Sequence, residues 1–304
     1  MDRLGAMEVF VLAVETGSFS AVARRLSLGQ PAVSKQIAQL EAQLGSRLLL
    51  RSTRGLTPTE AGEAYYQRAR QILDDIREAD AMVAQCRGEL SGRLRVSAPV
   101  TFARLHIIPH LTAFMGAHPG LEIEILLDDG NVDLISAGID VALRLGEQAD
   151  SALVARRLSH CARRVLGTPA YLAARGMPTS PQDLQEHDLV IYSPKPGLGQ
   201  QWLFCRGEEQ IAFAGRGRLT VSAAEGMRAA VLAGMGLAVS SEWMFAPELA
   251  RGEVVPILAD WQLPRLELWA LFPAGRQLSA KSRAFVAFVA SLPDLQLAAH
   301  SPLE

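Results

Sequence analysis

Apolar residues recur at helical spacing in three successive stretches near the start of the chain. The first stretch covers 4–14, and the second covers 20–26 with Ser20 as a candidate N-cap. The third begins near Pro31, since proline is well tolerated at the first position of a helix. It ends at Gly45, since glycine often terminates helices. Its apolar positions follow 4-3-4 spacing: Val33, Ile37, Leu40 and Leu44. The pattern predicts three amphipathic helices.

The second and third predicted helices are joined by a short turn at 27–29. Two helices joined by a Gly-containing turn, the second with a polar N-terminal end, form the helix-turn-helix pattern, which we place at about 19–38. Charge supports this interpretation, because 18–58 holds six basic residues and only Glu41 as an acid, a local balance of +5 in a chain of −2. The basic residues are Arg24, Arg25, Lys35, Arg47, Arg51 and Arg54.

The segment after the third helix fits a short β-hairpin. The apolar run 48–50 is followed by a turn at 52–55 and by Leu56 and Thr57. Such a hairpin would form a wing beside the third helix.

A long helical stretch follows from 59 to about 87, without Pro and with its only Gly near the start. Its apolar positions follow 4-3 spacing, as in a heptad repeat: Tyr65, Ala69, Ile72, Ile76, Ala79, Val83 and Cys86. A helix of roughly 42 Å is suited to pairing with a second copy of itself. Packing against its own chain remains the alternative.

Beyond residue 91 the pattern changes to alternating strands and helices. This rhythm is typical of α/β domains with a parallel sheet. We expect strands at 94–96, 122–127, 140–145, 189–192, 219–221 and 237–239, and helices at 105–117, 132–137, 223–233 and 281–292.

Composition is that of an ordinary globular protein, with 49% hydrophobic and 20% charged residues in 304 positions, enough for two or three structural units. No apolar run approaches the roughly 18 residues of a membrane span, and charges occupy the N-terminus where a signal peptide needs an apolar run. We therefore expect the protein in the cytoplasm. The three cysteines have no paired spacing and are interpreted as buried thiols: Cys86, Cys161 and Cys205.

Enzymatic motifs are missing from the sequence. There is no nucleophile elbow, no P-loop and no complete dinucleotide fingerprint, and Gly234–Gly236 fits a tight turn that leads into a strand. His106 and His110 lie four positions apart, but the Glu of a zincin motif and a third ligand are missing. We expect a surface or core role for them and a structural role for His160 and Cys161. No cofactor or metal is predicted.

The order of these parts resembles the LysR-type transcriptional regulators, and the likeness covers nearly the whole chain. The stretches that carry it are Phe10–Gly17, Ser18–Leu26, Gln30–Ser34, Ile37–Gly45, Arg51–Arg54, Leu56–Gly62, Leu94–Pro99, Val132–Leu134, Asp140–Arg144 and Ala233–Ala238. The match is most specific over the first sixty residues.

The resemblance implies three parts. They are an α-helical winged helix-turn-helix domain at 1–59, a linker and dimerisation helix at 60–90, and a two-lobed α/β effector domain at 91–300 of the periplasmic-binding-protein-like (type 2) class. The chain of such a domain crosses between lobes twice. We place one lobe at 91–161 with 266–300 and the other at 162–265.

For DNA, the resemblance implies that the third helix enters the major groove. Gln30 can then pair with adenine, and Ser34 and Lys35 can reach a base or a phosphate. Pro31 and Ala32 are candidates for contact with a thymine methyl, or are simply the start of a helix. The phosphate or minor-groove contacts are expected from Arg24, Arg25, Arg51 and Arg54.

The effector is expected at the carboxyl ends of strands, between the lobes. One candidate segment follows the first strand and offers hydroxyls and free N–H groups at a helix start. A second is Ser222–Glu225, interpreted as a capping box. Arg144 could hold a carboxylate, or could pair with Asp140, Glu147 or Asp150. The candidate effector residues are Ser97, Ala98, Thr101, Arg144, Ser193 and Ser222, with Thr101 and Ser222 alternatively serving as helix caps. They favour a small organic anion.

The sequence therefore predicts a DNA-binding transcriptional regulator and not an enzyme. It would bind double-stranded DNA at an inverted repeat near a promoter, as a homodimer or homotetramer. A small-molecule effector would change the placement of the DNA-binding heads and their contact with RNA polymerase. A protein that only captures a solute is the other alternative, and the first ninety residues argue against it.

Overall fold

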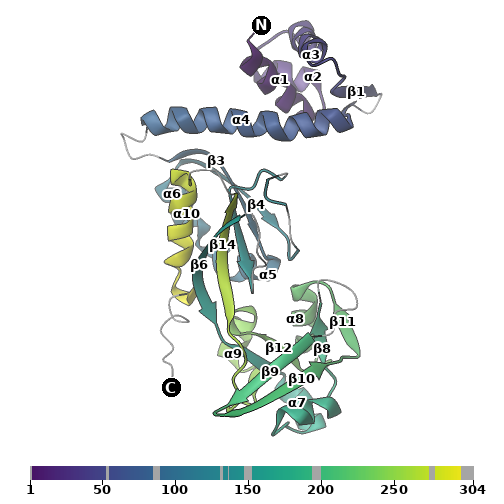
Figure 1. Ribbon diagram of the computed structural model, residues 1–304, viewed down its shortest axis with the longest axis vertical. Coiled ribbons are helices and arrows are strands. Elements are labelled where there is room, and N and C mark those ends of the chain that lie inside the picture. The colour runs from purple at the N-terminus through teal and green to yellow at the C-terminus, as the bar shows by residue number, and fades with distance from the viewer. Residues whose placement is uncertain are drawn as a thin grey trace. The chain divides into compact units, whose positions relative to one another are not determined.

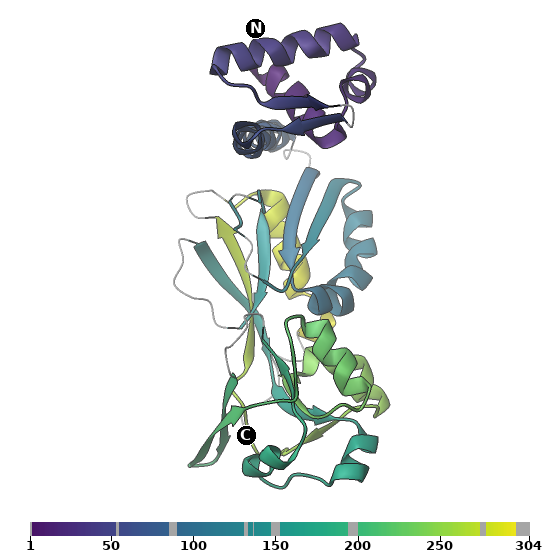
Figure 2. The same ribbon diagram turned by 90° about the vertical axis from the view of Figure 1, so that its right-hand side faces the viewer.

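The computed structural model describes residues 2–52, 55–84, 90–130, 133–135, 137–146, 153–193, 200–273 and 278–295 (Figures 1 and 2). The chain divides into two compact units. The first comprises residues up to 93 with 120–122 and 135–138, and the second comprises the rest. Each unit is described by itself.

The N-terminal unit is a winged helix-turn-helix followed by a long helix. Its elements are α1 (Arg3–Thr16), α2 (Phe19–Arg25), α3 (Gln30–Leu44), β1 (Leu49–Ser52), β2 (Gly55–Pro58) and α4 (Glu60–Ala84). The two strands pair antiparallel, which confirms the predicted hairpin. Gly45 ends α3 with a left-handed φ of 66°, as its position predicted.

The start of α2 differs from the prediction. Ser18, not Ser20, is the N-cap, because its extended backbone lets its hydroxyl accept the N–H of Ala21 at 3.4 Å. Ser20 lies inside the helix and its hydroxyl contacts that of Ser18 at 2.8 Å.

The apolar stripes of the three short helices meet in one core. Phe10 of α1, Val22 of α2 and Val33 of α3 are all fully buried there. Each such side chain stabilises the fold by about 1.5–3 kcal/mol relative to an exposed one. The polar face of α3 consequently stays outside this core.

The long helix α4 uses the first part of its apolar seam within its own chain. Ala69 is buried against α1 residues Met7 and Val11, and the ring of Tyr65 lies 5.5 Å from that of Phe10. Ile72, the next seam position, is 40% exposed. The seam positions Ala79, Val83 and Cys86 have side chains outside the described residues. Own-chain packing thus accounts for the first two seam positions, and pairing with a second copy stays a prediction.

The second unit contains a mixed five-stranded sheet of order β4-β3-β5-β14-β6. Its strands are β3 (Ser91–Ala98), β4 (Gly120–Leu127), β5 (Val141–Leu145), β6 (Leu153–Cys161) and β14 (Leu266–Pro273). Strands β3 and β5 are parallel, but β14 runs antiparallel to both β5 and β6. The alternating pattern is typical of parallel sheets, but this sheet is mixed, because β14 lies between β5 and β6 and runs antiparallel to both.

Helices cover this sheet. An irregular helical run comprises α5 (Val100–Phe102), a π-helical turn (Ala103–Ile107), a 3₁₀ turn (Ile108–His110) and α6 (Leu111–Ala117). The last helix, α10 (Ala280–Ala290), packs on α6, where the ring of Phe114 stacks on Phe288 at 4.7 Å (Figure 1). The run starts at 100, earlier than the predicted 105.

The remaining strands form smaller sheets. Strand β7 (Arg163–Gly167) pairs antiparallel with β12 (Ala238–Ser241) and β13 (Val255–Ile257). Strand β8 (Val190–Tyr192) pairs parallel with β11 (Leu219–Val221), and β9 (Gln200–Arg206) forms a hairpin with β10 (Glu209–Gly215). The helices here are α7 (Pro169–Arg175), α8 (Ala224–Leu232) and α9 (Ala246–Arg251), with 3₁₀ turns at Pro181–Glu186 and Glu242–Phe245.

Three local expectations can be compared directly. The turn before β12 is confirmed, because Gly234 has a φ of 74° and a Cβ on Gly236 would lie 2.2 Å from the carbonyl oxygen of Asp188. The helix expected at 132–137 is wrong, since its described residues 133–135 and 137 form turns and an irregular segment. Cys161 is buried as expected, Cys205 is only half-buried, and Cys86 lies outside the described residues.

No helix within the described ranges is long and apolar enough to cross a membrane.

Candidate DNA-binding surface and ligand cavity

The polar end of α3 is exposed. Gln30, Pro31, Ala32 and Lys35 are all exposed, and Ser34 is half-buried. The reason is helical periodicity: Val33, Ile37 and Leu40 turn into the core, so these intervening positions face outward. The five candidate recognition residues therefore occupy one accessible helix end.

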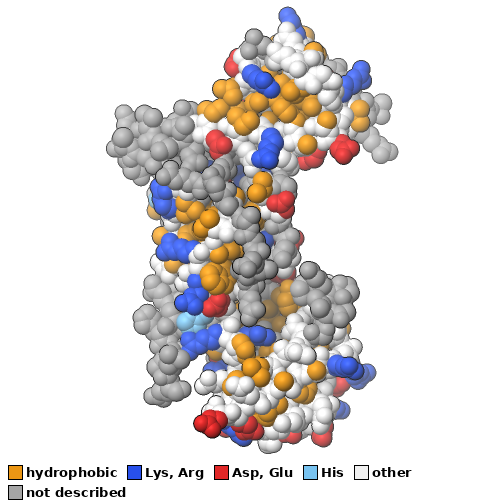
Figure 3. All heavy atoms as spheres, viewed as in Figure 1, with side chains coloured by type: hydrophobic (Ala, Val, Ile, Leu, Met, Phe, Trp, Pro, Cys, Tyr) orange, Lys and Arg blue, Asp and Glu red, His pale blue; other side chains and the backbone are white. Residues whose placement is uncertain are grey.

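Basic side chains accompany this helix. Arg24 and Arg25 in the last turn of α2 are both exposed. Figure 3 shows Lys and Arg side chains on the surface of the N-terminal unit. Arg51 lies on β1 opposite Leu56, but its side chain and the whole of Arg54 lie outside the described residues. The two wing candidates thus remain untested predictions.

The single acid of this basic segment has a structural role that the sequence did not suggest. The Oε1 atom of Glu41 accepts the backbone N–H of Leu48 at 2.8 Å and that of Leu49 at 3.1 Å. Glu41 therefore joins the last turns of α3 to the start of the wing.

The second unit contains a cavity of about 410 Å³ where its two groups of strands meet. Its walls combine charged, polar and apolar side chains from distant parts of the sequence. They are Pro99, Asp128, Asp129, Arg144, Leu145, Arg163, Tyr192, Gln200, Ala224, Met227, Val239, Ser240, Ser241, Met244 and Leu266. Of the six predicted effector residues, only Arg144 lines it.

Arg144, near the end of β5, is 7% exposed. Its Nη1 donates to the hydroxyl of Ser97 at 3.1 Å and to the carbonyl of Leu143 at 3.0 Å, whereas Nη2 has no partner among the described residues. Burial lowers the pKa of the guanidinium and the charge of Asp128 opposes that shift. The arrangement leaves one buried N–H group available to a ligand.

The alternative partners of Arg144 divide into two groups. Asp140 accepts the backbone N–H of Arg95 at 2.9 Å, whereas the guanidinium of Arg144 donates to Ser97 and Leu143. Glu147 and Asp150 lie outside the described residues.

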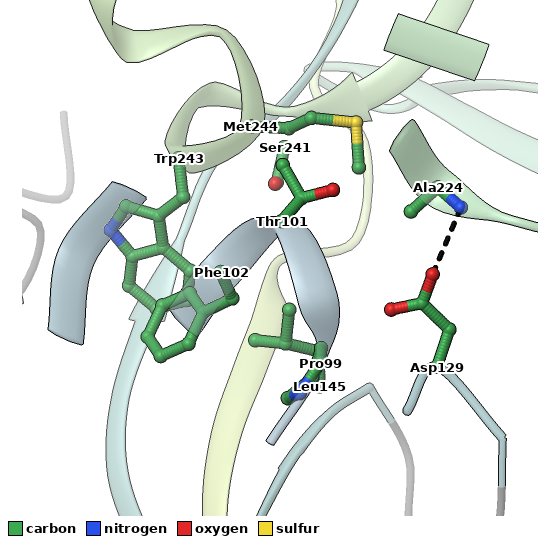
Figure 4. A pocket seen from close by; sticks show the side chains of 9 residues that line it. All are labelled: Pro99, Thr101, Phe102, Asp129, Leu145, Ala224, Ser241, Trp243 and Met244. Carbon is green, nitrogen blue, oxygen red and sulfur yellow. Dashed lines mark hydrogen bonds between the residues drawn. The ribbon is translucent and has the colours of Figure 1, made fainter. Parts of the chain in front are cut away.

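The helix start after β3 is not free, contrary to expectation. Asp129 accepts the N–H of Val100 at 2.9 Å through Oδ1 and that of Ala224 at 3.1 Å through Oδ2. Figure 4 shows the bond to Ala224 beside a small pocket of about 30 Å³ that adjoins the cavity. One carboxylate of the chain therefore already occupies the positive ends of α5 and α8.

The predicted capping box at 222–225 is also wrong. The N-cap of α8 is Ala223, which makes no side-chain bond, and Ser222 is exposed. Glu225 instead accepts from the hydroxyl of Thr101 at 2.9 Å and from Arg104 at 3.0 Å. Burial raises the pKa of Glu225, but these hydrogen bonds and the nearby guanidiniums outweigh it and lower the pKa overall.

The four other effector candidates make their contacts outside the larger cavity. Thr101 lines only the small pocket, and Ser97 supports Arg144. The carbonyl of Ala98 accepts the N–H of Asp128 at 3.0 Å, and the N–H of Ser193 donates to Val221 at 2.9 Å. None of these four lines the larger cavity.

Sequence reasoning missed several lining residues. Burial, with the charges of Asp129 and Asp128, raises the pKa of Tyr192 to about 12, so its hydroxyl stays protonated. Gln200 donates its side-chain amide to the carbonyl of Tyr192. The acidic pair Asp128 and Asp129, which directly follows β4, is a signal in the sequence that could have pointed to this wall.

Both ring nitrogens of His106 already have partners in the protein. His106 is buried, with Nδ1 2.8 Å from Asp294 and Nε2 2.8 Å from the carbonyl of Trp243. This confirms the expected core role of His106. No group of three potential metal ligands occurs within the described ranges.

A winged helix-turn-helix joined to an α/β unit with a ligand-sized cavity defines a class: DNA-binding proteins that carry a separate small-molecule domain. Two family models match the chain accordingly. "Bacterial regulatory helix-turn-helix protein, lysR family" matches residues 4–63, and "LysR substrate binding domain" matches residues 87–293.

The chain is similar to known regulators over most of its length. The chain is 36% identical to the regulator PtxR of Pseudomonas aeruginosa over 93% of this chain and 91% of PtxR. The solved structure of CrgA, a LysR-type transcriptional regulator from Neisseria meningitidis, is similar with a TM-score of 0.61 at 30% identity, covering 94% of this chain and 97% of CrgA. Full-length AphB, a virulence activator of Vibrio cholerae, has a TM-score of 0.57 at 30% identity, covering 94% and 98%.

The chain belongs to the LysR family of bacterial transcriptional regulators. It is a DNA-binding regulator with an effector-binding domain, and its family is not a class of enzymes.

Proposed function

We propose that this regulator binds an inverted repeat near a promoter as a dimer or tetramer and acts in the cytoplasm, where bacterial DNA is found. The DNA-binding domain comprises 1–59, the linker helix 60–90 and the effector domain 91–300, with lobes at 91–161 plus 266–300 and at 162–265. The observation that carries this proposal is the exposed polar end of α3, held rigidly by its buried stripe.

In the proposed complex the exposed end of α3 reads bases. Gln30 reads an adenine, and Ser34 and Lys35 reach a base or a phosphate. Pro31 and Ala32 contact a thymine methyl. Phosphates or the minor groove are contacted by Arg24, Arg25, Arg51 and Arg54.

The proposed effector is a small molecule with an anionic group. Arg144 supports this proposal, because a buried guanidinium with an unsatisfied N–H gains most from a carboxylate partner. Ser97 accepts a hydrogen bond from Arg144, and Thr101 lines the small pocket that adjoins the cavity, so both are proposed to belong to the effector site. Effector contact by Ser193, Ala98 and Ser222 has less support, because their contacts lie elsewhere. Ligand binding would shift the equilibrium between arrangements of the DNA-binding heads and change their contact with RNA polymerase.

A mobility-shift assay with the full-length protein and the DNA upstream of its gene tests DNA recognition. Gln30→Ala should weaken specific binding by about 1–3 kcal/mol and relax preference at one base pair, because it removes a bidentate base contact. Arg24→Ala should weaken specific and random DNA alike and lower the salt slope by about one.

Failure of the unaltered protein to bind any such fragment at low salt would refute the proposal. If Gln30→Ala lowered the affinity for all DNA sequences equally, Gln30 would not be a base-reading residue.

A further inference from the structure

Two acidic and two basic side chains line the same cavity in the effector domain. They are Asp128, Asp129, Arg144 and Arg163. Their formal charges cancel, so a ligand that carries only a carboxylate would meet two carboxylates as well as two guanidiniums. Like charges at close quarters oppose binding. A ligand that matches this charge pattern therefore carries a positive group as well as a negative one.

Asp129 does not need a ligand. Both of its oxygens accept backbone N–H groups, from Val100 at 2.9 Å and from Ala224 at 3.1 Å. These bonds hold its charge at the starts of two helical segments, where negative charge is favourable. A ligand carboxylate cannot use the same N–H groups while Asp129 holds them.

Asp128 is less well satisfied. Its Oδ1 accepts the N–H of Gly130 at 2.5 Å, and no other side-chain hydrogen bond of Asp128 occurs within the described part of the chain. Its charge acts on both Arg144 and Tyr192. Asp128, Arg144 and Tyr192 all line the same cavity.

Arg144 presents the opposite charge across that space. Its Nη2 is buried and unpartnered among the described residues. Asp128 and Arg144 interact electrostatically, but neither a hydrogen bond nor an ion pair joins these two described residues. A negative and a positive group thus stand apart on one cavity wall, each with unused hydrogen-bonding capacity.

We propose that the effector is a zwitterion of the amino-acid type, with its carboxylate on Arg144 and its ammonium group on Asp128. This rests on the proposed function and names the ligand class of that site. Apolar side chains complete the cavity and receive the remainder of the ligand: Pro99, Leu145, Met227, Val239, Met244 and Leu266. The volume of about 410 Å³ suits a molecule of this size.

Calorimetric titration of the full-length protein with the twenty common L-amino acids tests the ligand class. For each amino acid that binds, the same skeleton is titrated without its amino group and, separately, without its carboxylate. We expect at least one amino acid to bind, and each deletion to weaken binding tenfold or more, since each removes a charge-assisted hydrogen bond. Binding of none of the amino acids, or equal binding of the acid without its amino group, would overturn the proposal.

Asp128→Asn provides the second measurement. The variant keeps an oxygen for the N–H of Gly130, so the loop should fold. Compared with the unaltered protein, we expect this variant to bind the amino acid at least tenfold more weakly, because the ammonium group loses its carboxylate partner. We expect it to bind the deaminated acid more tightly, because one repulsive negative charge is gone. Asp260→Asn, at an exposed position outside the cavity lining, is the matched control and should change neither affinity. Unchanged affinities in Asp128→Asn would also overturn the proposal.

The mobility-shift assay separates this proposal from the proposed function. If only the deaminated acid binds and alters the DNA complex, the regulator proposal stands and the zwitterion proposal fails. If an amino acid binds as expected but no DNA fragment is bound, the DNA-recognition proposal fails alone.

Discussion

At the scale of single residues, Arg144 is a buried cation whose hydrogen bonds are incomplete. A charge with 7% exposure and an unpaired nitrogen costs folding free energy unless a partner satisfies it. Natural proteins retain such groups where function requires them. The residue is therefore expected to matter more for ligand response than for stability.

Arg144→Met tests that expectation. The substitution removes a buried, partly unsatisfied charge. It should therefore leave the free energy of unfolding of the ligand-free protein unchanged or raise it by about 1 kcal/mol, with no fall in melting temperature. It should keep DNA binding and abolish the effect of ligand on the DNA complex. Thermal unfolding and mobility shift with and without ligand measure both; an unaltered ligand response would remove Arg144 from the site.

Asp183 gives a residue-scale prediction of pH dependence. Hydrogen bonds from Thr179 and Ser180 lower its pKa from 3.8 to about 2. The unfolded chain binds the proton more readily, so the stabilisation is present above pH about 4 and is lost as pH falls toward 2. Carboxyl-carbon NMR should give a titration midpoint near 2 for Asp183. A midpoint near 3.8 would contradict the hydrogen bonds from Thr179 and Ser180.

At the scale of elements, Glu41 joins α3 to the wing. Its carboxylate accepts two backbone N–H groups, of Leu48 and Leu49, that precede β1 or start it. The only acid in the basic segment thus fixes the start of the wing hairpin to α3.

Glu41→Ala should destabilise the N-terminal unit by about 1–3 kcal/mol, because both N–H groups lose their acceptor. Affinity for specific and random DNA should fall together as the wing loses its fixed position. Glu41→Gln keeps an oxygen and should retain most of the stability, which makes it the control. Chemical denaturation and mobility shift provide the measurements; tighter DNA binding in both variants would mean that charge, not positioning, is the role of Glu41.

At the scale of the whole molecule, we expect self-association to use a part of α4 that its own chain leaves exposed. Tyr65 and Ala69 pack on α1, but Ile72 is 40% exposed. An exposed apolar residue in a heptad pattern is suited to a second copy of the helix.

Ile72→Glu should therefore weaken the dimer at least tenfold, since it introduces a charge into an apolar contact. Gln71→Glu, one position away, adds the same charge outside the seam and should leave association unchanged. Sedimentation velocity over a concentration series distinguishes them. Equal association of both variants with the unaltered protein would exclude Ile72 from the interface.

The elements near the chain start could be predicted because their signals are local. Spacing of Val33, Ile37 and Leu40, the Gly45 terminator and the sign of neighbouring charges are all properties of short segments. Even there, the cap of α2 was misplaced by two residues, since Ser18 and Ser20 are both plausible caps and the backbone geometry of Ser18 decides between them.

The sequence by itself determined the winged helix-turn-helix, the long helix and the α/β character of the rest of the chain, because hydrophobic periodicity and turn residues specify elements locally. Only the tertiary structure decided how distant charges are used. In the folded chain Asp129 accepts N–H groups at two helix starts, and Glu225 accepts a hydrogen bond from Thr101. Strand β14 lies between β5 and β6. Hydrogen bonds between residues far apart in sequence depend on which chain segments fold together, and no local pattern records that.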